Sequence, residues 1–211
     1  MLECFDALME RHRDEINSGP FDHVRDALLD RREKVASSKD LDDRLDAFGD
    51  AMKAGRDRIK MWSLNKEGYA AIGTGLKKTY KRSRNAMDEA YAEPSVERVH
   101  EWRKRVKYNR YHTRLLREMW EPVMKPWRDE VKSLSDLLGD DHDLGVFRDI
   151  LIKESDRFGP RDDLSALLAL IDQRRKELQA WAHPLGQRIY AEKPGRHRER
   201  LGRIWQAWRT E

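Results

Sequence analysis

Basic side chains recur on one face of an expected helix near the middle of the chain. Successive residues of an α-helix are about 100° apart around its axis, so four cations lie within about 40° of Arg103. Together with it they define the 103–117 row: Arg103, Lys107, Arg110, Arg114 and Arg117. His100 lies about 60° from Arg103 on the same helix. Guanidinium groups bind phosphate oxygens in bidentate fashion, and ammonium groups act as compact point charges. At 1.5 Å per residue the row spans about 21 Å, which predicts a binding surface for a linear polyanion.

The expected helix before it repeats this plan. Three cations share one of its faces and define the 77–84 row: Lys77, Lys81 and Arg84. Lys78 and Lys104 flank the two rows. Each helix also carries an apolar stripe that should anchor it to a core, and the stripes are Tyr69, Ile72, Leu76, Tyr80 and Met87, and Val99, Trp102, Val106, Thr113, Leu116 and Trp120. Like charges four residues apart destabilise an isolated helix, so we expect both rows to point into one shared groove where a bound polyanion compensates them.

The charge of the chain is concentrated rather than spread. The formal net charge is +4, but residues 77–117 contain 13 basic and 5 acidic residues, so this segment carries +8 and the rest of the chain −4. A second basic segment, 193–209, contains 6 basic residues and 1 acidic residue. Charge concentrated in this way focuses the electrostatic field on one region, which indicates a localised anionic partner.

Three interpretations of the basic helices stay open on charge alone. They bind a polyphosphate-like polyanion, they bind nucleic acid, or they are solvated faces of a structural or partner-binding bundle whose acidic neighbours neutralise them. Readout of bases needs side chains that stack on bases or enter a groove of the nucleic acid. The aromatic residues here lie mostly on apolar faces, so nucleic-acid binding is the less favoured interpretation. His100 taken alone is typical of a structural histidine rather than a catalytic one.

Apolar residues recur at helical spacing almost everywhere, and no run alternates as a strand does. The sequence therefore predicts an all-α protein of antiparallel helical bundles with short connections. The expected helices are 2–17, 21–36, 40–61, 66–92, 95–118, 123–139, 143–157, 162–182 and 196–209. The expected breaks are Ser18-Gly19-Pro20, Glu93-Pro94-Ser95, Gly139-Asp140, Gly159-Pro160 and Lys193-Pro194-Gly195. Ser95 is expected to cap the helix that follows it.

Cys4 is the only cysteine, which excludes an intramolecular disulfide and a multi-cysteine metal site and fits a reducing cytosol. The amphipathic N-terminus has mixed charge and lacks the pattern of a secretory signal. No segment approaches the roughly 20 apolar residues that span a bilayer. We therefore expect a cytoplasmic protein with no membrane partner.

Two segments together resemble a known family. The run VHEWRKRVKYNRY at 99–111, followed by LLGDDHDL at 137–144, resembles the conserved-histidine α-helical domain, CHAD. The segment 75–84 is similar to the basic helix that precedes this motif in bacterial members. The resemblance implies two four-helix bundles around a basic central channel, binding of inorganic polyphosphate and, for some members, association with polyphosphate or storage granules.

By position, the resemblance assigns the phosphate contacts to His100, Arg103, Lys104, Lys107, Arg110 and Arg114 and, on other helices, to Lys77, Lys81, Arg84 and Lys132. The family usually has two copies of the histidine-bearing helix, and this sequence has one clear copy. The resemblance therefore implies a single CHAD-like domain over 1–211, in which 1–64 form a partial first bundle without its leading helices and 65–211 form the second bundle. Such a chain would expose an open half-site or complete the bundle as a homodimer.

The segment Asp140-Asp141-His142-Asp143 offers groups that divalent cations accept as ligands. Consecutive residues cannot all converge on one ion, so we expect Gly139 to end one helix, an Asp to cap the next, and the other carboxylates to pair with the basic helices. Neither a supported Ser or Cys nucleophile nor a glycine-rich phosphate loop is evident. We therefore expect no metal, no cofactor and no catalytic residues, but a non-enzymatic binding site that phosphate or sulfate ions can also occupy.

Overall fold

The computed structural model describes residues 1–13 and 21–210, and the described elements are all helical. The all-α prediction is therefore confirmed. The α-helices are α1 (Leu2–Arg11), α2 (Asp22–Ala36), α3 (Lys39–Lys60), α4 (Gly68–Ala92), α5 (Val96–Leu115), α6 (Glu121–Lys153), α7 (Arg161–Ile189) and α8 (Pro194–Trp208). Short 3-10 turns at Arg117–Met119 and Ser155–Arg157 follow α5 and α6.

The chain divides into two compact units. Unit 1 contains Met1–Asn65 and Asp149–Leu168, and unit 2 contains Lys66–Arg148 and Ala169–Glu211. The first division falls one residue after the expected boundary at 64. The segment 149–168 groups with the first unit, although the expected second bundle ran from 65 to 211 without interruption.

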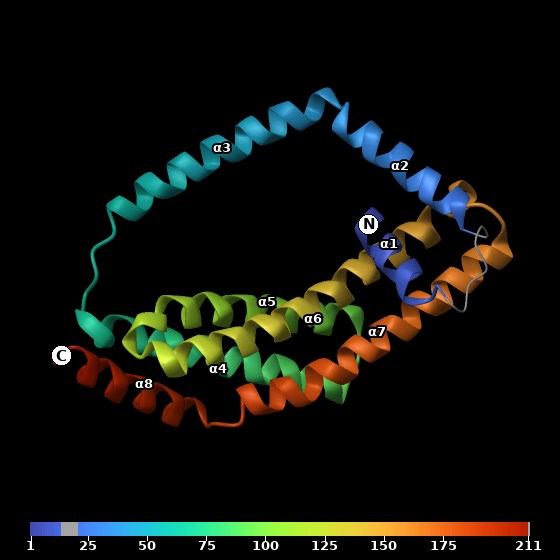
Figure 1. The fold of residues 1–211 in the computed structure, drawn as a ribbon. Helices are drawn as coiled ribbons and strands as arrows, with labels where there is room; N and C mark the ends of the chain where they lie inside the picture. Colours follow the sequence, from blue (N-terminus) through green and yellow to red (C-terminus); the bar gives the residue numbers. More distant parts are fainter. Residues whose placement is uncertain (14–20, 211) are drawn as a thin grey trace. The chain divides into compact units, whose positions relative to one another are not determined.

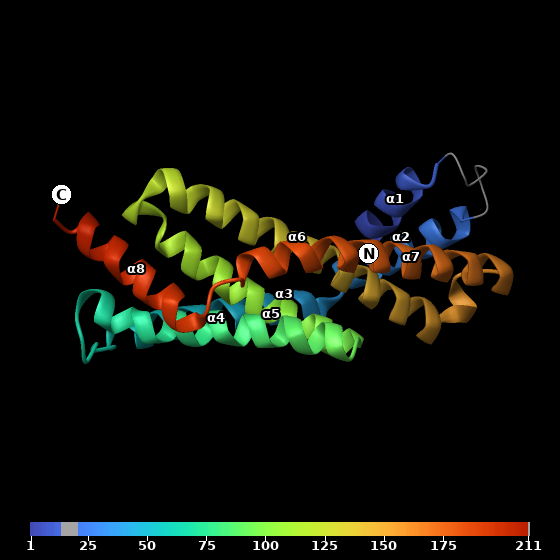
Figure 2. The same cartoon turned by 90° about the horizontal axis from the view of Figure 1, so that it is seen from below.

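Unit 2 is built around the apolar faces of its long helices. Figures 1 and 2 show α4 lying beside both α5 and α8. Trp102 and Val106 from α5, Tyr80 from α4 and Leu138 from α6 are fully buried in one core cluster. A smaller cluster joins α8 to α4 through Leu201 and Leu76. The apolar stripes predicted for α4 and α5 thus anchor these helices, with the exceptions of Ile72 in α4, which is 37% exposed, and Trp120 beyond the end of α5, which is 52% exposed.

Local signals set several helix ends as expected. The Ser95 hydroxyl accepts a hydrogen bond from the backbone N–H of Arg98 at 3.2 Å, so the predicted cap of α5 is confirmed. Gly159 has φ +89° in the break between α6 and α7, a conformation that favours glycine. Pro194 starts α8, where its missing N–H costs no hydrogen bond. The expected break at Ser18-Gly19-Pro20 and the end of the expected first helix lie outside the described residues.

The predicted break at Gly139-Asp140 is wrong. Helix α6 runs without interruption from Glu121 to Lys153. Glycine weakens a helix by about 1 kcal/mol relative to alanine. The buried residues on both sides of it, Leu138, Asp141 and Leu144, follow helical spacing, so burial of this face outweighs the local cost.

Candidate functional site

The 103–117 row lies on the side of α5 that faces α6. The Arg110 Nη1 and the Asp136 Oδ1 of α6 are 3.5 Å apart. Farther toward the start of α5, the rings of His100 and His142 of α6 stack with their centroids 4.8 Å apart. These two contacts place the row beside α6. Arg117 belongs to the 3-10 turn after α5, because the helix ends at Leu115 rather than at the expected 118.

Three of the four cations of this row that lie within α5 have no carboxylate partner among the described residues. Within the described part of the chain, no acidic side chain lies within 4.0 Å of Arg103, Lys107 or Arg114. Lys107 and Arg114 are exposed, and Arg103 is half-buried. From Arg103 to Arg114 the row extends about 16 Å at 1.5 Å per residue. The part of the row within α5 therefore offers three uncompensated positive charges to an anion.

The other predicted contacts from α5 and α6 are partly neutralised. Lys104 Nζ pairs with Glu101 Oε2 at 3.0 Å. Lys132 pairs with Asp136, the same carboxylate that Arg110 approaches. One carboxylate between two cations leaves that cluster with a formal charge of +1. Exposed ion pairs of this kind contribute 0–1 kcal/mol and can reorganise around a stronger ligand.

His100 is held in an environment that disfavours its protonated form. Burial lowers the pKa of His100, and the neighbouring His142, Arg103 and Lys104 lower it further against the opposing effect of Glu101. The ring is therefore neutral near pH 7 in the unliganded protein. A polyanion bound beside it would raise this pKa again, since an opposite charge favours the protonated form.

The 77–84 row lies elsewhere on unit 2. Tyr80 of α4 donates hydrogen bonds toward the carbonyl oxygens of Ile189 and Glu192, each at 3.1 Å, at the connection between α7 and α8. Burial raises the pKa of Tyr80 to about 12, and the charge of Arg84 opposes this rise, so Arg84 lies near Tyr80. The 77–84 row is therefore on the side of α4 near α7 and α8. No carboxylate lies within 4.0 Å of any of its three cations among residues 1–13 and 21–210.

The contact between α4 and α5 separates the two rows. The Ser83 hydroxyl of α4 donates to the carbonyl oxygen of Arg105 in α5 at 2.8 Å. At 100° per residue, the 77–84 row is about 100–160° from Ser83 around α4. The α5 cations from Arg103 to Arg114 are about 140–180° from Arg105 around α5. The structure thus places the rows on different sides of the α4–α5 pair instead of in one shared groove.

The acidic segment of α6 serves packing. Asp141 is 1% exposed, and its carboxylate accepts hydrogen bonds from Arg175 Nε at 3.1 Å and from Gln179 Nε2 at 2.8 Å, both in α7. His142 Nδ1 lies 2.9 Å from Asp143 Oδ1. The expected pairing with the basic helices is therefore wrong for Asp141, whose partner is Arg175 of α7. Among the described residues, no group of three or more His, Cys, Asp or Glu side chains could hold a metal ion.

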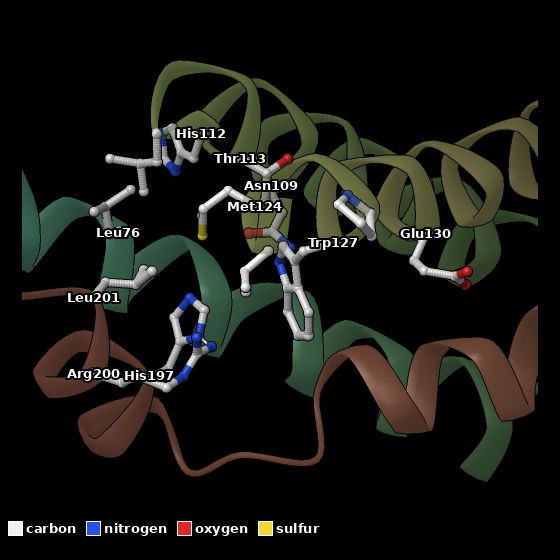
Figure 3. A pocket seen from close by; sticks show the side chains of 13 residues that line it. Leu76, Asn109, His112, Thr113, Met124, Trp127, Glu130, His197, Arg200 and Leu201 are labelled. Carbon is white, nitrogen blue, oxygen red and sulfur yellow. Dashed lines mark hydrogen bonds between the residues drawn. The ribbon is translucent and has the colours of Figure 1, made fainter. Parts of the chain in front are cut away.

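A pocket that the sequence did not predict lies among α4, α5, α6 and α8. It has a volume of about 310 Å³ (Figure 3). Its lining is mostly apolar and includes Leu76, Met124, Trp127 and Leu201, together with His112 and His197. His197 is buried, which lowers its pKa to about 4 with further help from Arg200. Leu76 belongs to the apolar stripe that the sequence predicted for α4. Only long-range packing, however, brings the four helices around one cavity.

The basic segment 193–209 forms α8, which packs on α4. Tyr69 donates a hydrogen bond to the carbonyl oxygen of Arg198 at 2.6 Å, and its ring lies 6.2 Å from that of Trp205. Arg200 pairs with Glu192 at 3.2 Å, and Arg203 pairs with Glu199 at 2.7 Å. This segment therefore covers the bundle, and part of its charge is neutralised locally.

Comparisons with known proteins place the chain in a family. No curated protein and no solved structure matches it significantly. None of the described helices is long and apolar enough to cross a membrane. The family profile of the CHAD domain matches residues 1–152, which include the segment 1–64 as well as the 103–117 row. The chain belongs to the CHAD domain family.

Proposed function

We propose that the protein binds inorganic polyphosphate, without turning it over, along the groove between α5 and α6. The observation that carries the proposal is the set of three cations, Arg103, Lys107 and Arg114, that share one face of α5 and have no acidic partner in the described residues. His100, Lys104, Arg110 and Lys132 line the same region. Membership of the CHAD family supports a polyanionic ligand.

Like charges at helical spacing repel one another, by a few tenths of a kcal/mol per pair in an isolated helix. A structural role would be better served by cations paired with the carboxylates in which the chain is rich. A linear chain of phosphates relieves the repulsion, since each phosphate accepts charge-assisted hydrogen bonds from one or two cations. The about 16 Å between Arg103 and Arg114 suits an extended ligand better than a single small anion.

Arg110 and Lys132 contribute in a different way. Both contact Asp136 in the unliganded protein. A phosphate group entering the groove competes with this carboxylate for both cations. The 77–84 row, on another side of unit 2, is a secondary contact region that a long chain reaches only by bending around α4.

Binding without turnover is part of the proposal. Phosphoryl transfer usually needs a metal ion held by carboxylates next to the phosphate site. The most buried carboxylate near the groove, Asp141, is already engaged by Arg175 and Gln179. Purified protein with Mg²⁺ should therefore release no orthophosphate from polyphosphate above the rate without protein. Release at an enzymatic rate would contradict this part of the proposal.

Competition between polyanions tests the choice of ligand. Long-chain polyphosphate should displace a random DNA duplex from the protein at equal phosphate concentration, because the groove offers charge rather than groups that read bases. The opposite order would favour nucleic acid. Absence of binding to either polymer would favour a structural or partner-binding bundle. Cytoplasmic polyphosphate or storage granules are the proposed destination, and fluorescence microscopy of tagged protein with and without polyphosphate synthesis tests it.

A further inference from the structure

Helix α3 carries an apolar stripe that no part of its own unit buries. Leu45, Phe48, Met52 and Ile59 are 57%, 63%, 56% and 57% exposed. No α3 residue whose side chain is described is buried. Large apolar side chains scattered singly over a surface need no explanation, but a contiguous stripe indicates a surface that another molecule covers.

The spacing of the stripe is that of a coiled coil. Starting from Leu41, steps of four and three residues alternate along the helix at positions 41, 45, 48, 52, 55 and 59 and reach position 62 just beyond its end. These positions are occupied by Leu, Leu, Phe, Met, Gly, Ile and Trp. An apolar residue at every 3.5 positions keeps one seam facing a partner helix over the whole length. The 22 residues of α3 provide about three heptads.

The charges of α3 specify a direction for the partner helix. The first half, 39–49, contains four acidic and two basic residues, and the second half, 50–60, contains four basic and two acidic residues. The halves therefore carry −2 and +2. A parallel copy would place like halves together, whereas an antiparallel copy places each acidic half against a basic half.

We propose that α3 pairs with α3 of a second copy of this chain as an antiparallel coiled coil. Centring the pair at residue 50 places Phe48 opposite Met52 of the second copy and Leu45 opposite Gly55, where the missing side chain leaves room for the leucine. Asp42 then lies beside Arg56 of the second copy. Arg44 faces a cation there, but it is already paired with Asp40 at 2.6 Å.

The mass in solution tests the pairing. Light scattering over a concentration series should give twice the chain mass of 25.0 kDa. The double variant Leu45→Glu/Met52→Glu places four charges in the seam of the dimer and should give the mass of one chain. The control Ala47→Glu/Ala54→Glu adds the same charge on the opposite face of α3 and should leave the dimer intact. A wild-type monomer at every concentration, or equal loss of the dimer in both variants, overturns the proposal.

Cross-linking tests the direction. In a Cys4→Ser background, Gly49→Cys is next to the centre of an antiparallel pair, so a short bismaleimide should link two copies of this variant. Asp42→Cys should not link to itself but should link to Arg56→Cys when the two variants are mixed. Self-linking of Asp42→Cys without linking to Arg56→Cys would indicate a parallel pair and refute the proposed arrangement. Helical content and thermal unfolding of the three cysteine variants should match those of the Cys4→Ser background, because positions 42, 49 and 56 lie outside a buried core.

Discussion

Replacing the three unpaired cations of α5 by glutamine should weaken polyphosphate binding without weakening the fold. Arg103, Lys107 and Arg114 have no acidic partner among the described residues, so the triple variant leaves no carboxylate unpaired. Arg110 is left intact because its removal would change the environment of Asp136. Exposed substitutions of this kind change the free energy of unfolding by about 0.5 kcal/mol or less.

The loss of affinity follows from the number of contacts removed. An exposed ionic contact contributes about 0.5–1 kcal/mol, so three of them contribute about 1.5–3 kcal/mol. This corresponds to a Kd that rises about 10- to 150-fold. Each cation that neutralises a phosphate of a flexible polyanion also releases a counterion, so the slope of log K against log salt concentration should become shallower by about 2.

The 77–84 row provides a matched control. The variant Lys77→Gln/Lys81→Gln/Arg84→Gln removes the same charge from two exposed and one half-buried side chain, again without a carboxylate partner among the described residues, but on another side of the bundle. Titration calorimetry with polyphosphate of defined length at several salt concentrations compares the two variants. The α5 variant should lose most of the affinity and the control little. Equal losses would show that net charge, rather than the position of the cations on α5, determines binding, and would refute the reasoning.

Three further predictions concern single side chains. Affinity for polyphosphate should rise as the pH falls from 7 to 6, because the ligand favours protonated His100, and titrations of His100→Gln should show a smaller rise; an unchanged pH dependence would exclude this histidine. Replacing Asp141 by Ala leaves Arg175 buried without its partner and should lower the free energy of unfolding in urea by about 3–5 kcal/mol; a loss below 1 kcal/mol would contradict the assigned role. Because the pKa of His197 is lowered to about 4, the folded protein binds fewer protons than the unfolded chain between pH 6.5 and 4. The free energy of unfolding should therefore decrease by roughly 3 kcal/mol as the pH is lowered from 6.5 to 4. Denaturation of His197→Gln over the same pH range should show a smaller decrease.

The features that the sequence predicted well depend on local helical geometry. The all-α fold, the apolar faces of α4 and α5 and the Ser95 cap follow from contacts between residues three or four positions apart. The 103–117 row belongs to this class, because side chains at this spacing share a face of any helix. The CHAD motif added the family, which the match over residues 1–152 confirmed.

Other features depend on which helix packs against which. In the sequence, Gly139 predicts the end of a helix. Helix α6 nevertheless continues through this residue, because residues on both sides of Gly139 are buried. The family resemblance predicts that Lys132 contacts the ligand. The structure adds that Asp136 contacts both Lys132 and Arg110. The pocket beside Trp127 combines residues from four helices.

The sequence by itself therefore determined the helical class, the family and the alignment of cations along α5, since all three are encoded in short-range spacing. Only the tertiary structure decided that the 77–84 and 103–117 rows lie on different sides of the α4–α5 pair and that three of the α5 cations have no carboxylate partner in the described part of the chain. The physical reason is that the rotation of a helix about its axis is set by the partners that bury its apolar face, and these partners are distant in the chain.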